Sequence, residues 1–409
     1  MKKIKVGFIG LGQRGAGLFI DGGGLMGCTF AMENVVVSAV CDVFSDRVER
    51  AIKIVEEKGY PQPFGTTNYR ELLKQDLDVV IISSAWEAHV PLAVATMKAG
   101  IPTALEVGGG YSVDDCFRLV HTYEETGTPF MFLENCCYGK KELTITNMVR
   151  KGVFGEVVYC HGAYGHDLRE EICGGITSKH YRLRNYMMRN CDNYPTHNLG
   201  PIAKLLNINR GNRMLRLSSM ASKSCGLNAY AKENEKYAGL ANKSFQQGDI
   251  IHTSITCADG TLITLKLDTT LPRPYSREFS VSGTKAIYNE VGNVLMADGT
   301  FEHEFTNIND CLNTASKYEN EYLPKVWKDM TQEEIELGHG GMDFIMLREL
   351  FSAIEEKREM PIDVYDAATW MCITALSEKS IALGGAVVDI PDFTGGRWVM
   401  RESKDVMEL

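Results

Sequence analysis

The sequence predicts an α/β chain in two parts. A doubly wound parallel sheet at the N-terminus is followed by an α+β domain with a large, mainly antiparallel open sheet. Three observations predict this order. Short Val/Ile-rich runs alternate with amphipathic segments over the first third of the chain. A glycine pattern follows the first of those runs. After the segment 148–157 the chain changes to longer runs in which apolar and polar residues alternate.

The N-terminal strands have the continuous apolar character of strands that are buried on both faces. The segments between them end in glycine and are amphipathic, which predicts helices; examples are FSDRVERAIKIVEEKG, HVPLAVATMKAG and SVDDCFRLVHTYEETG. Alternation of strand and helix predicts a doubly wound sheet. The expected strands are 4–10, 35–42, 78–84 and 102–107, and 128–135 is a further strand of this sheet or the connection out of it.

The second part contains long alternating stretches separated by Asp-Gly and Gly turns, which predict antiparallel strands. DIIHTSITCADGTLITLKLDTT and EFSVSGTKAIYNEVGNVLMADG are the clearest of them. We therefore expect one domain over 1–135 and a second over 136–370. A C-terminal helix and tail over 371–409 should pack on the body.

Composition describes an ordinary globular chain of 409 residues with a net charge of -10 and a pI near 5.5. The acidic balance argues against nucleic acid as a partner, and no apolar run is long enough for a membrane span. The twelve cysteines include no CxxC pair, which favours reduced thiols. We expect a cytoplasmic protein with a small-molecule substrate, or a periplasmic one if a leader was removed. A homodimer or higher homo-oligomer stays open.

The glycine pattern in IGLGQRG predicts a dinucleotide-binding turn of the Rossmann type. Such glycines permit a tight turn and let the backbone approach a pyrophosphate closely. Asp42 ends the second strand, where a carboxylate accepts hydrogen bonds from ribose hydroxyls and repels a 2′-phosphate, so NAD is favoured over NADP. A plain glycine turn and a solvated aspartate are the alternatives. The cofactor-binding candidates here are Gly10, Gly12, Gln13, Arg14, Gly15 and Asp42.

Further cofactor-binding candidates lie where later strands end, because ligands bind at the carboxyl edge of a parallel sheet. SSAWEAH contributes Ser84, Trp86 and His89, with core packing as the alternative for the last two. Glu106 ends the next strand and is followed by three glycines, where a side chain would obstruct a flat nicotinamide ring. Glu134 ends FMFLE and is expected to bind the nicotinamide ribose or a sugar hydroxyl.

These residues carry a family resemblance. IGLGQRG, SSAWEAH, Glu106 and the order of the two domains resemble the Gfo/Idh/MocA oxidoreductases. Typical dehydrogenases of that group have Glu-Lys-Pro where this chain has Glu106-Val107-Gly108, and the missing lysine is their usual proton-transfer residue. One branch, the NAD-dependent α-N-acetylgalactosaminidases, is similar over FLENCCYGKKELTITNMVRKGVFGE, GAYGHDLR, NYPTHNLGPIAKLLNINRG, LPRPYSREF and HGGMDFIMLREL.

The resemblance implies an NAD-binding Rossmann domain over 1–135, a substrate and oligomerisation domain over 136–370, and the activity of a redox-neutral glycoside hydrolase. NAD would oxidise the sugar transiently at C3, which acidifies the hydrogen at C2 and permits elimination across C1 and C2. Addition of water and re-reduction would complete the turnover. The released sugar would be terminal α-N-acetylgalactosamine or a related one. Two alternatives stay open: an NAD-dependent sugar or inositol dehydrogenase of the Gfo/Idh/MocA type, and a non-catalytic NAD-binding sensor.

Four side chains are the catalytic candidates. Tyr194 and His197 lie three residues apart in NYPTHNLG, near the expected start of a helix, and a histidine suits proton transfer near neutral pH. The resemblance adds Tyr164 of GAYGHDLR and Tyr275 of PRPYSREF. A free tyrosine has a pKa of about 10, so Tyr164 would need a neighbouring charge to act as the base at C2. Which tyrosine is that base stays open.

The substrate-binding candidates are polar side chains beside these motifs. In HDLR, His166 and Arg169 could bind substrate, and a plain salt bridge of Asp167 with Arg169 is the alternative. His339 in HGG is a weaker candidate. No HExxH or clustered-thiolate pattern predicts a metal. An ordinary pair of glycosidase carboxylates would leave the glycine pattern without a purpose. The full substrate-binding set is Asn135, Tyr138, His166, Arg169 and Arg273.

Overall fold

The computed structural model describes residues 3–17, 24–108, 110–300 and 306–409 and divides into two compact units. Unit 1 contains Met1–Gly139, Val326–Ala368 and Val406–Glu408, whereas unit 2 contains Lys140–Lys325, Thr369–Asp405 and Leu409. This division differs from the expected ranges because the chain returns to unit 1 after 325. Within unit 1, α15 (Met342–Glu356) packs against α2 (Gly24–Phe30) and the 3-10 helix η1 (Asn135–Tyr138).

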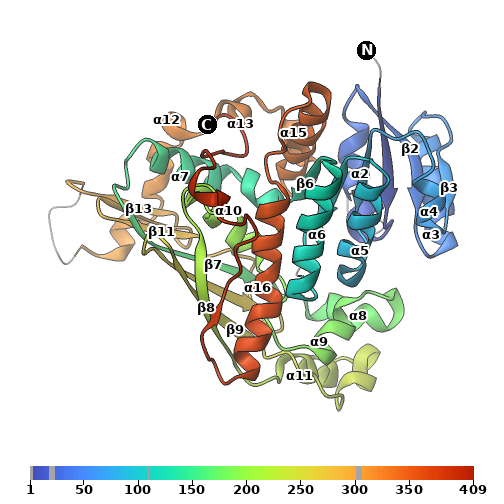
Figure 1. The fold of residues 1–409 in the computed structure, drawn as a ribbon. Coiled ribbons are helices and arrows are strands. Elements are labelled where there is room, and N and C mark those ends of the chain that lie inside the picture. The colour runs from blue at the N-terminus through green and yellow to red at the C-terminus, as the bar shows by residue number, and fades with distance from the viewer. Residues whose placement is uncertain (1–2, 18–23, 109, 301–305) are drawn as a thin grey trace. The chain divides into compact units, whose positions relative to one another are not determined.

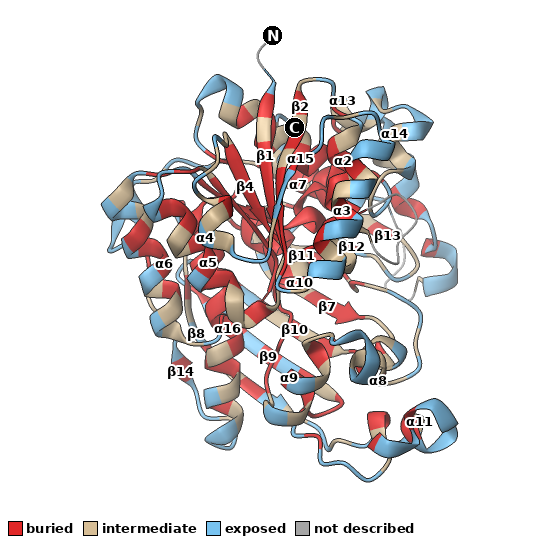
Figure 2. Ribbon diagram, turned by 90° about the vertical axis from the view of Figure 1, so that its right-hand side faces the viewer, coloured by how far each residue is buried: buried red, intermediate tan, exposed pale blue. Residues whose placement is uncertain are grey.

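Unit 1 is built on a six-stranded sheet in the order β3-β2-β1-β4-β5-β6, in which every pair is parallel (Figure 1). The predicted parallel sheet is therefore confirmed. Figure 2 shows β1 and β4 as largely buried, in keeping with their continuous apolar sequence. The connection order reverses between β1 and β4, where sheets of this kind bind ligands. The strands are β1 (Ile4–Ile9), β2 (Val35–Cys41), β3 (Phe64–Thr66), β4 (Val79–Ile82), β5 (Thr103–Glu106) and β6 (Phe130–Leu133).

Helix α6 of unit 1 carries a cap at each end. In α6 the Ser112 hydroxyl accepts the backbone N–H of Asp115 at 3.0 Å, and Gly127 ends the helix in the left-handed region. The helix after the glycine pattern is only four residues long, and 18–23 lie outside the described residues. The remaining helices are α1 (Gln13–Ala16), α3 (Ser45–Glu57), α4 (Tyr69–Leu72), α5 (Trp86–Lys98), α6 (Val113–Thr126) and α14 (Gln332–Glu336), while α13 (Lys325–Asp329) and α16 (Val364–Ala382) cross the division.

Unit 2 is built on an eight-stranded sheet in the order β13-β12-β11-β7-β10-β9-β8-β14. Among the described strands of this sheet only β7 and β10 pair in parallel, so the predicted mainly antiparallel sheet is confirmed. Residues of β9 and β10 alternate between buried and more exposed positions, as in a sheet with one covered face. The strands are β7 (Val157–Gly165), β8 (Met214–Ala221), β9 (Ile250–Cys257), β10 (Leu262–Asp268), β11 (Ser280–Gly283), β12 (Ala286–Asn289), β13 (Val294–Ala297) and β14 (Val388–Asp389).

Helix α10 (Thr196–Leu205) covers β7 at a glycine. The Asn198 side-chain amide donates to the Gly162 carbonyl at 3.1 Å, and a Cβ at Gly162 would lie 2.8 Å from that of Asn198. This close approach sets the start of α10 against the strand. The other helices of unit 2 are α7 (Lys140–Arg150), α8 (Arg169–Ser178), α9 (Arg182–Met188), α11 (Gly226–Glu233), α12 (Glu319–Tyr322) and the 3-10 helices η2 (Glu235–Leu240), η3 (Ile308–Cys311), η4 (Thr314–Tyr318) and η5 (Arg397–Val399).

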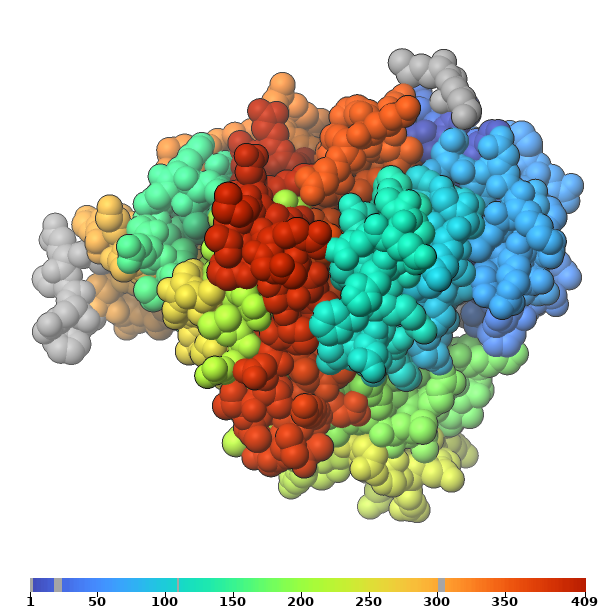
Figure 3. Space-filling model, viewed as in Figure 1, coloured from blue at the N-terminus to red at the C-terminus, as the bar shows by residue number. Residues whose placement is uncertain are grey.

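The C-terminal residues of unit 2 lie on the molecular surface, where Figure 3 shows them in deep red. β14 pairs with β8, and Arg150 and Asp405 form an ion pair at 2.9 Å. The predicted tail is thereby attached to its unit. All twelve cysteines fall within the described residues and none forms a disulfide. None of the described helices is both long and apolar enough to cross a membrane.

Candidate active site

The glycine turn of unit 1 is shaped by close backbone contacts. Gly10 follows β1 with a φ of 95°, and a Cβ there would lie 2.6 Å from the backbone of Ser83. The Ser83 hydroxyl donates to the Gly10 carbonyl at 2.8 Å. At Gly12 the nearest atom to an added Cβ would be 3.6 Å away, so the backbone there is accessible. The chain after β1 and the chain after β4 are thus in close backbone contact.

Asp42 follows β2 and lies buried against this turn. One carboxylate oxygen accepts the backbone N–H of Leu11 at 2.7 Å, and the other accepts that of Phe44 at 3.0 Å. Arg47 approaches the first oxygen at 3.7 Å. A carboxylate oxygen has lone pairs for more than one donor, so Asp42 can fix the turn and still accept a further hydroxyl.

Arg14 is used for an ion cluster inside unit 1. Its guanidinium donates from Nε to Glu106 at 2.6 Å and from two nitrogens to Asp343 at 2.5 and 2.8 Å. His339 and Asn135 complete the cluster, because each contacts the Asp343 carboxylate at 2.8 Å. Asp343 was missed by the sequence analysis, although it stands in the quoted stretch HGGMDFIMLREL.

The cluster sets opposite protonation tendencies on its two carboxyl groups. Burial raises the pKa of Glu106, although the Arg14 charge opposes that shift. Burial also acts to raise the pKa of Asp343, but the Arg14 charge and hydrogen bonds outweigh it and hold the pKa well below its usual range. Arg14 and Glu106 therefore join α1 to the end of β5.

The segment SSAWEAH after β4 is held by a neutral histidine, His89. Nε2 of His89 lies 2.9 Å from the Ser84 carbonyl, which accepts the hydrogen bond. Burial lowers the pKa of His89 to about 4. A Cβ at Gly108 would lie 2.5 Å from the Trp86 indole. The first of the three glycines after β5 is thus required by an aromatic neighbour. The second, at position 109, lies outside the described residues.

The remaining candidates of unit 1 differ in how deeply they are placed. The Glu134 carboxylate accepts the N–H of Cys136 at 3.1 Å and caps η1 immediately after β6. Tyr138 is completely buried, and burial raises its pKa well above the usual value. Tyr138 therefore occupies a core position. Gln13 is the first residue of α1 and lies beside the glycine turn.

The predicted catalytic side chains of unit 2 form one aromatic cluster. The rings of Tyr164 and Tyr194 lie 4.6 Å apart, and His197 is 5.5 and 4.7 Å from them. The Tyr164 hydroxyl and Nδ1 of His166 are 3.2 Å apart. The His166 ring meets Tyr275 edge-on at 5.1 Å. Four catalytic candidates and one substrate-binding candidate are thus brought together from β7, α10 and the chain before β11.

A buried amide network positions the segment before α10. The Gln247 side chain accepts the Asn193 amide at 3.1 Å and donates to the Cys191 carbonyl at 2.9 Å. The backbone N–H of Asp192 donates to the Ser377 hydroxyl at 2.9 Å. Burial raises the pKa of Asp192 to about 7, so burial of this segment also changes its protonation. These contacts fix Tyr194 directly before the helix that carries His197.

Arg182 is a charged neighbour of the aromatic cluster that the sequence analysis missed. It lies in the stretch REEICGGITSKHYRLRNYMMRNCD, which has no recognisable motif, so only its charge was visible. Its guanidinium lies 4.9 Å from the Tyr194 ring centre and pairs with Glu171 at 2.8 Å. Burial raises the pKa of Tyr164, and Arg182 partly opposes this shift. Burial, with Arg182, lowers the pKa of His166.

Two other predicted residues take part in ion pairs outside the aromatic cluster. Arg169 binds Asp167 at 2.6 and 2.8 Å, which is the salt bridge that the sequence analysis left as an alternative. Arg273 binds Asp268 at 2.6 Å and Glu278 at 2.9 Å. Its guanidinium lies over Gly165, on the face of β7 opposite Tyr164.

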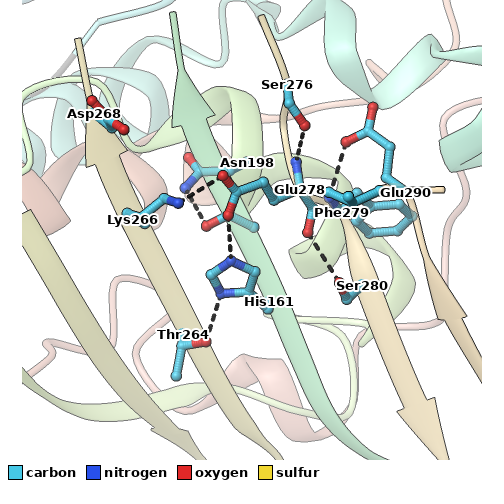
Figure 4. A network of polar contacts seen from close by, with 12 residues as sticks. His161, Asn198, Thr264, Lys266, Asp268, Ser276, Glu278, Phe279, Ser280 and Glu290 are labelled. Atoms are coloured by element: carbon cyan, nitrogen blue, oxygen red, sulfur yellow. Dashed lines mark hydrogen bonds and ion pairs between the residues drawn. The ribbon is translucent and has the colours of Figure 1, made fainter. Parts of the chain in front are cut away.

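Glu278 is the centre of the polar network in Figure 4. Its carboxylate contacts Lys266 at 2.6 Å and His161 at 3.4 Å. Hydrogen bonds from Lys266 and Arg273, with the Lys266 charge, outweigh burial and lower the pKa of Glu278 to about 2. The network therefore stabilises the outer face of the sheet.

Comparisons with known proteins agree with this arrangement. The family model described as glycosyl hydrolase 109, C-terminal domain, matches residues 138–400. An α-N-acetylgalactosaminidase of Tannerella forsythia is 38% identical, with 98% of this chain and 88% of the relative covered. A glycosyl hydrolase family 109 protein of Parabacteroides distasonis is 36% identical, with 98% and 89% covered.

The similar solved structures are oxidoreductases. Levoglucosan dehydrogenase in complex with NADH and L-sorbose has a TM-score of 0.70 at 15% identity, covering 96% of this chain and 100% of that one. The myo-inositol 2-dehydrogenase of Lactobacillus plantarum has a TM-score of 0.63 at 14% identity, covering 95% and 100%. These structures share the fold, and the predicted family resemblance is confirmed. The chain is a glycoside hydrolase and belongs to glycosyl hydrolase family 109.

Proposed function

We propose that this chain is an NAD-dependent, redox-neutral glycosidase that releases terminal α-linked N-acetylgalactosamine or a related sugar. The relative from Tannerella forsythia bears the name of that activity. The observation that carries the proposal is the hydrogen bond of the Tyr164 hydroxyl to His166 inside the aromatic cluster. It supplies a proton-transfer group in a chain that has valine where related dehydrogenases have their lysine.

The glycine turn of unit 1 fits a dinucleotide. The backbone at Gly12 is accessible, Gly10 leaves no room for a side chain, and Asp42 stands at the end of β2 where a ribose would bind. Bound NAD would supply reversible hydride exchange with a sugar carbon, without net oxidation. Arg14 and Glu106 would support this site indirectly, since their side chains bind each other. The residues that would hold NAD are Gly10, Gly12, Gly15, Asp42, Ser84, Trp86 and Glu134.

The unit 2 side chains would carry the proton chemistry. Because the pKa of His166 is lowered, its imidazole is neutral near pH 7 and has a lone pair for the Tyr164 proton. Burial raises the pKa of Tyr164 and opposes this transfer, so a positive charge such as that of Arg182 or of bound NAD would have to favour it. The Tyr164 oxygen could then take a proton from the sugar carbon next to the anomeric one. Tyr194 and His197 line the same cluster and would orient the sugar hydroxyls. Burial of the rings keeps water away from the base.

The proposal is tested with nitrophenyl glycosides and protein that has been stripped of nucleotide. Activity should be lost on stripping and return with NAD, and N-acetylgalactosamine released in deuterated water should carry deuterium at C2. Equal hydrolysis with and without NAD would contradict the proposal. Net formation of NADH from free sugar would instead indicate a dehydrogenase, and NAD binding without turnover would indicate a sensor.

A further inference from the structure

Tyr275 is held by a cation that no sequence motif assigned. Nη1 of Arg277 donates to the Tyr275 hydroxyl oxygen at 3.1 Å. The same guanidinium is anchored on the opposite side by Glu142, which accepts from Nε at 2.9 Å and also from Nη2. Arg277 and Glu142 are both buried, whereas Tyr275 is 49% exposed. The ion pair therefore fixes a phenol that remains accessible.

The direction of this hydrogen bond determines what the phenol can do. The Tyr275 oxygen accepts from Arg277, so its own proton is not used in that bond and can be donated to another group. A charge-assisted donor also stabilises the oxygen when it becomes negative. The guanidinium cannot accept a proton at any ordinary pH, so it cannot compete for the proton of Tyr275.

Tyr164 has the opposite kind of partner. Its hydroxyl faces the neutral His166 imidazole, which can accept a proton. The Tyr275 ring meets the same imidazole nearly edge-on, with the ring centres 5.1 Å apart. Two tyrosines of one cluster are thus differentiated by their neighbours, one beside an acceptor and the other beside a permanent donor.

The backbone around Arg277 is fixed from the outer face of the sheet. Ser276 and Gly165 exchange hydrogen bonds at 2.9 and 3.1 Å. Glu278, directly after Arg277, has a φ of 47°, which is uncommon for a residue with a side chain. The network of Figure 4 binds its carboxylate and offsets the cost of that conformation. A strained backbone is therefore maintained beside the pair that holds Tyr275.

We infer that Arg277, anchored by Glu142, is a positioning residue that makes Tyr275 the proton donor to the leaving group. The inference rests on the proposed function. As the bond from C1 to the glycosidic oxygen breaks, that oxygen keeps the electron pair and takes the Tyr275 proton, while the base removes the proton from C2 and the C1–C2 double bond forms. The phenolate then recovers a proton from the water that adds at C1. Arg277 stabilises the phenolate between these events.

The test compares Arg277→Met, Arg277→Lys and Glu142→Gln on two kinds of substrate. An alkyl α-N-acetylgalactosaminide needs protonation of its leaving oxygen, whereas a nitrophenyl one needs little. Arg277→Met should lower kcat on the alkyl substrate by on the order of 100-fold with little change in KM, and much less on the nitrophenyl substrate. Arg277→Lys keeps a positive charge and Glu142→Gln keeps the guanidinium, so each should lose less activity on the alkyl substrate than Arg277→Met does. Equal losses on both substrates, or a change in KM alone, would overturn the inference.

A second readout does not depend on turnover. In protein labelled with ¹³C at Cζ of tyrosine, the Tyr275 signal is assigned with Tyr275→Phe and titrated without substrate. Arg277→Met should move its titration to higher pH. The matched control is Arg189→Met, which removes another partly buried ion pair of unit 2, with Glu378 at 2.5 Å, and should leave the signal in place. An unmoved signal in Arg277→Met would overturn the inference even if the chain proves to have no glycosidase activity.

Discussion

The two units use polar residues in opposite ways. In unit 1, Arg14 binds both Glu106 and Asp343 and so joins α1 to β5 and α15, which leaves mainly backbone at the glycine turn for a ligand. In unit 2, Tyr164 and His166 meet inside an aromatic cluster where burial shifts both pKa values away from the charged forms. The comparison teaches that a glycine motif specifies the backbone conformation of a binding turn. Proton transfer instead requires side chains whose pKa values are set by burial.

The largest effect is expected from removing one oxygen in the aromatic cluster. Tyr164→Phe keeps the buried ring and loses the hydroxyl that faces His166, so kcat should fall roughly 1,000-fold with little change in folding. Steady-state kinetics on a nitrophenyl glycoside measure this. Tyr186→Phe is the matched control, because it removes a buried hydroxyl of the same unit that binds Thr269 at 2.6 Å. Similar losses in both variants would mean that the hydroxyl of Tyr164 has no special role.

The next effect concerns pH and unit 1. The folded pKa of His89, about 4, lies below its ordinary value of 6.5, so the unfolded chain binds the proton first as pH falls. The stability that the folded protein gains from keeping His89 neutral is fully present above pH 6.5 and is lost progressively down to about pH 4. Over that range the wild type should lose about 3 kcal/mol more than His89→Gln, which keeps a donor for the Ser84 carbonyl. Urea unfolding at several pH values checks it, and parallel curves for the two proteins would contradict it.

A smaller effect is expected for the ion cluster of unit 1. Asp343→Asn weakens the hold on Arg14 but leaves Glu106 in place, so the free energy of unfolding should fall by about 2 kcal/mol. The reacting groups of unit 2 are unchanged. The control is Asp115→Asn in the exposed pair with Arg118, at 2.7 Å, where a loss below about 1 kcal/mol is expected. Equal stability losses would show that burial of the cluster adds nothing.

The smallest effect is expected for the charge beside the tyrosines. Arg182 opposes the rise in the pKa of Tyr164, so Arg182→Met should raise that pKa further and lower kcat/KM roughly tenfold. Arg182→Lys keeps a positive charge and should recover much of the loss. Steady-state kinetics of the wild type and both variants at neutral pH measure the loss. If both variants lose the same activity, Arg182 acts through packing alone.

The fold was largely predictable because its signals are local. Continuous apolar runs gave the parallel strands and alternating runs gave the antiparallel ones, whereas β3 is too short for any periodicity to show. The return of 326–368 to unit 1 was missed, since it depends on the pairing of Asp343 with Arg14 across 329 positions.

The site was predictable where a motif carried the residue. One cluster contains all four predicted catalytic side chains, Tyr164, Tyr194, His197 and Tyr275. Most of their charged neighbours lie far away in the sequence, where no motif spacing identifies them. Glu142 and Arg277 are 135 residues apart. Arg277 could have been found, because it stands two residues after Tyr275 in PRPYSREF, at a distance where side chains of an extended chain share a side.

The discontinuity of unit 1 has a consequence for synthesis on the ribosome. Arg14 emerges 329 residues before Asp343, an interval on the order of half a minute at ordinary translation rates. During that time the nascent N-terminal sheet carries a cation that Glu106 alone must neutralise. Unit 2 is complete except for its last segments when 326–368 appears, so residues 1–139 must wait for a segment of their own unit that is made after most of unit 2. Nascent chains stalled before residue 326 should consequently be more sensitive to proteases in their first 139 residues than the finished protein.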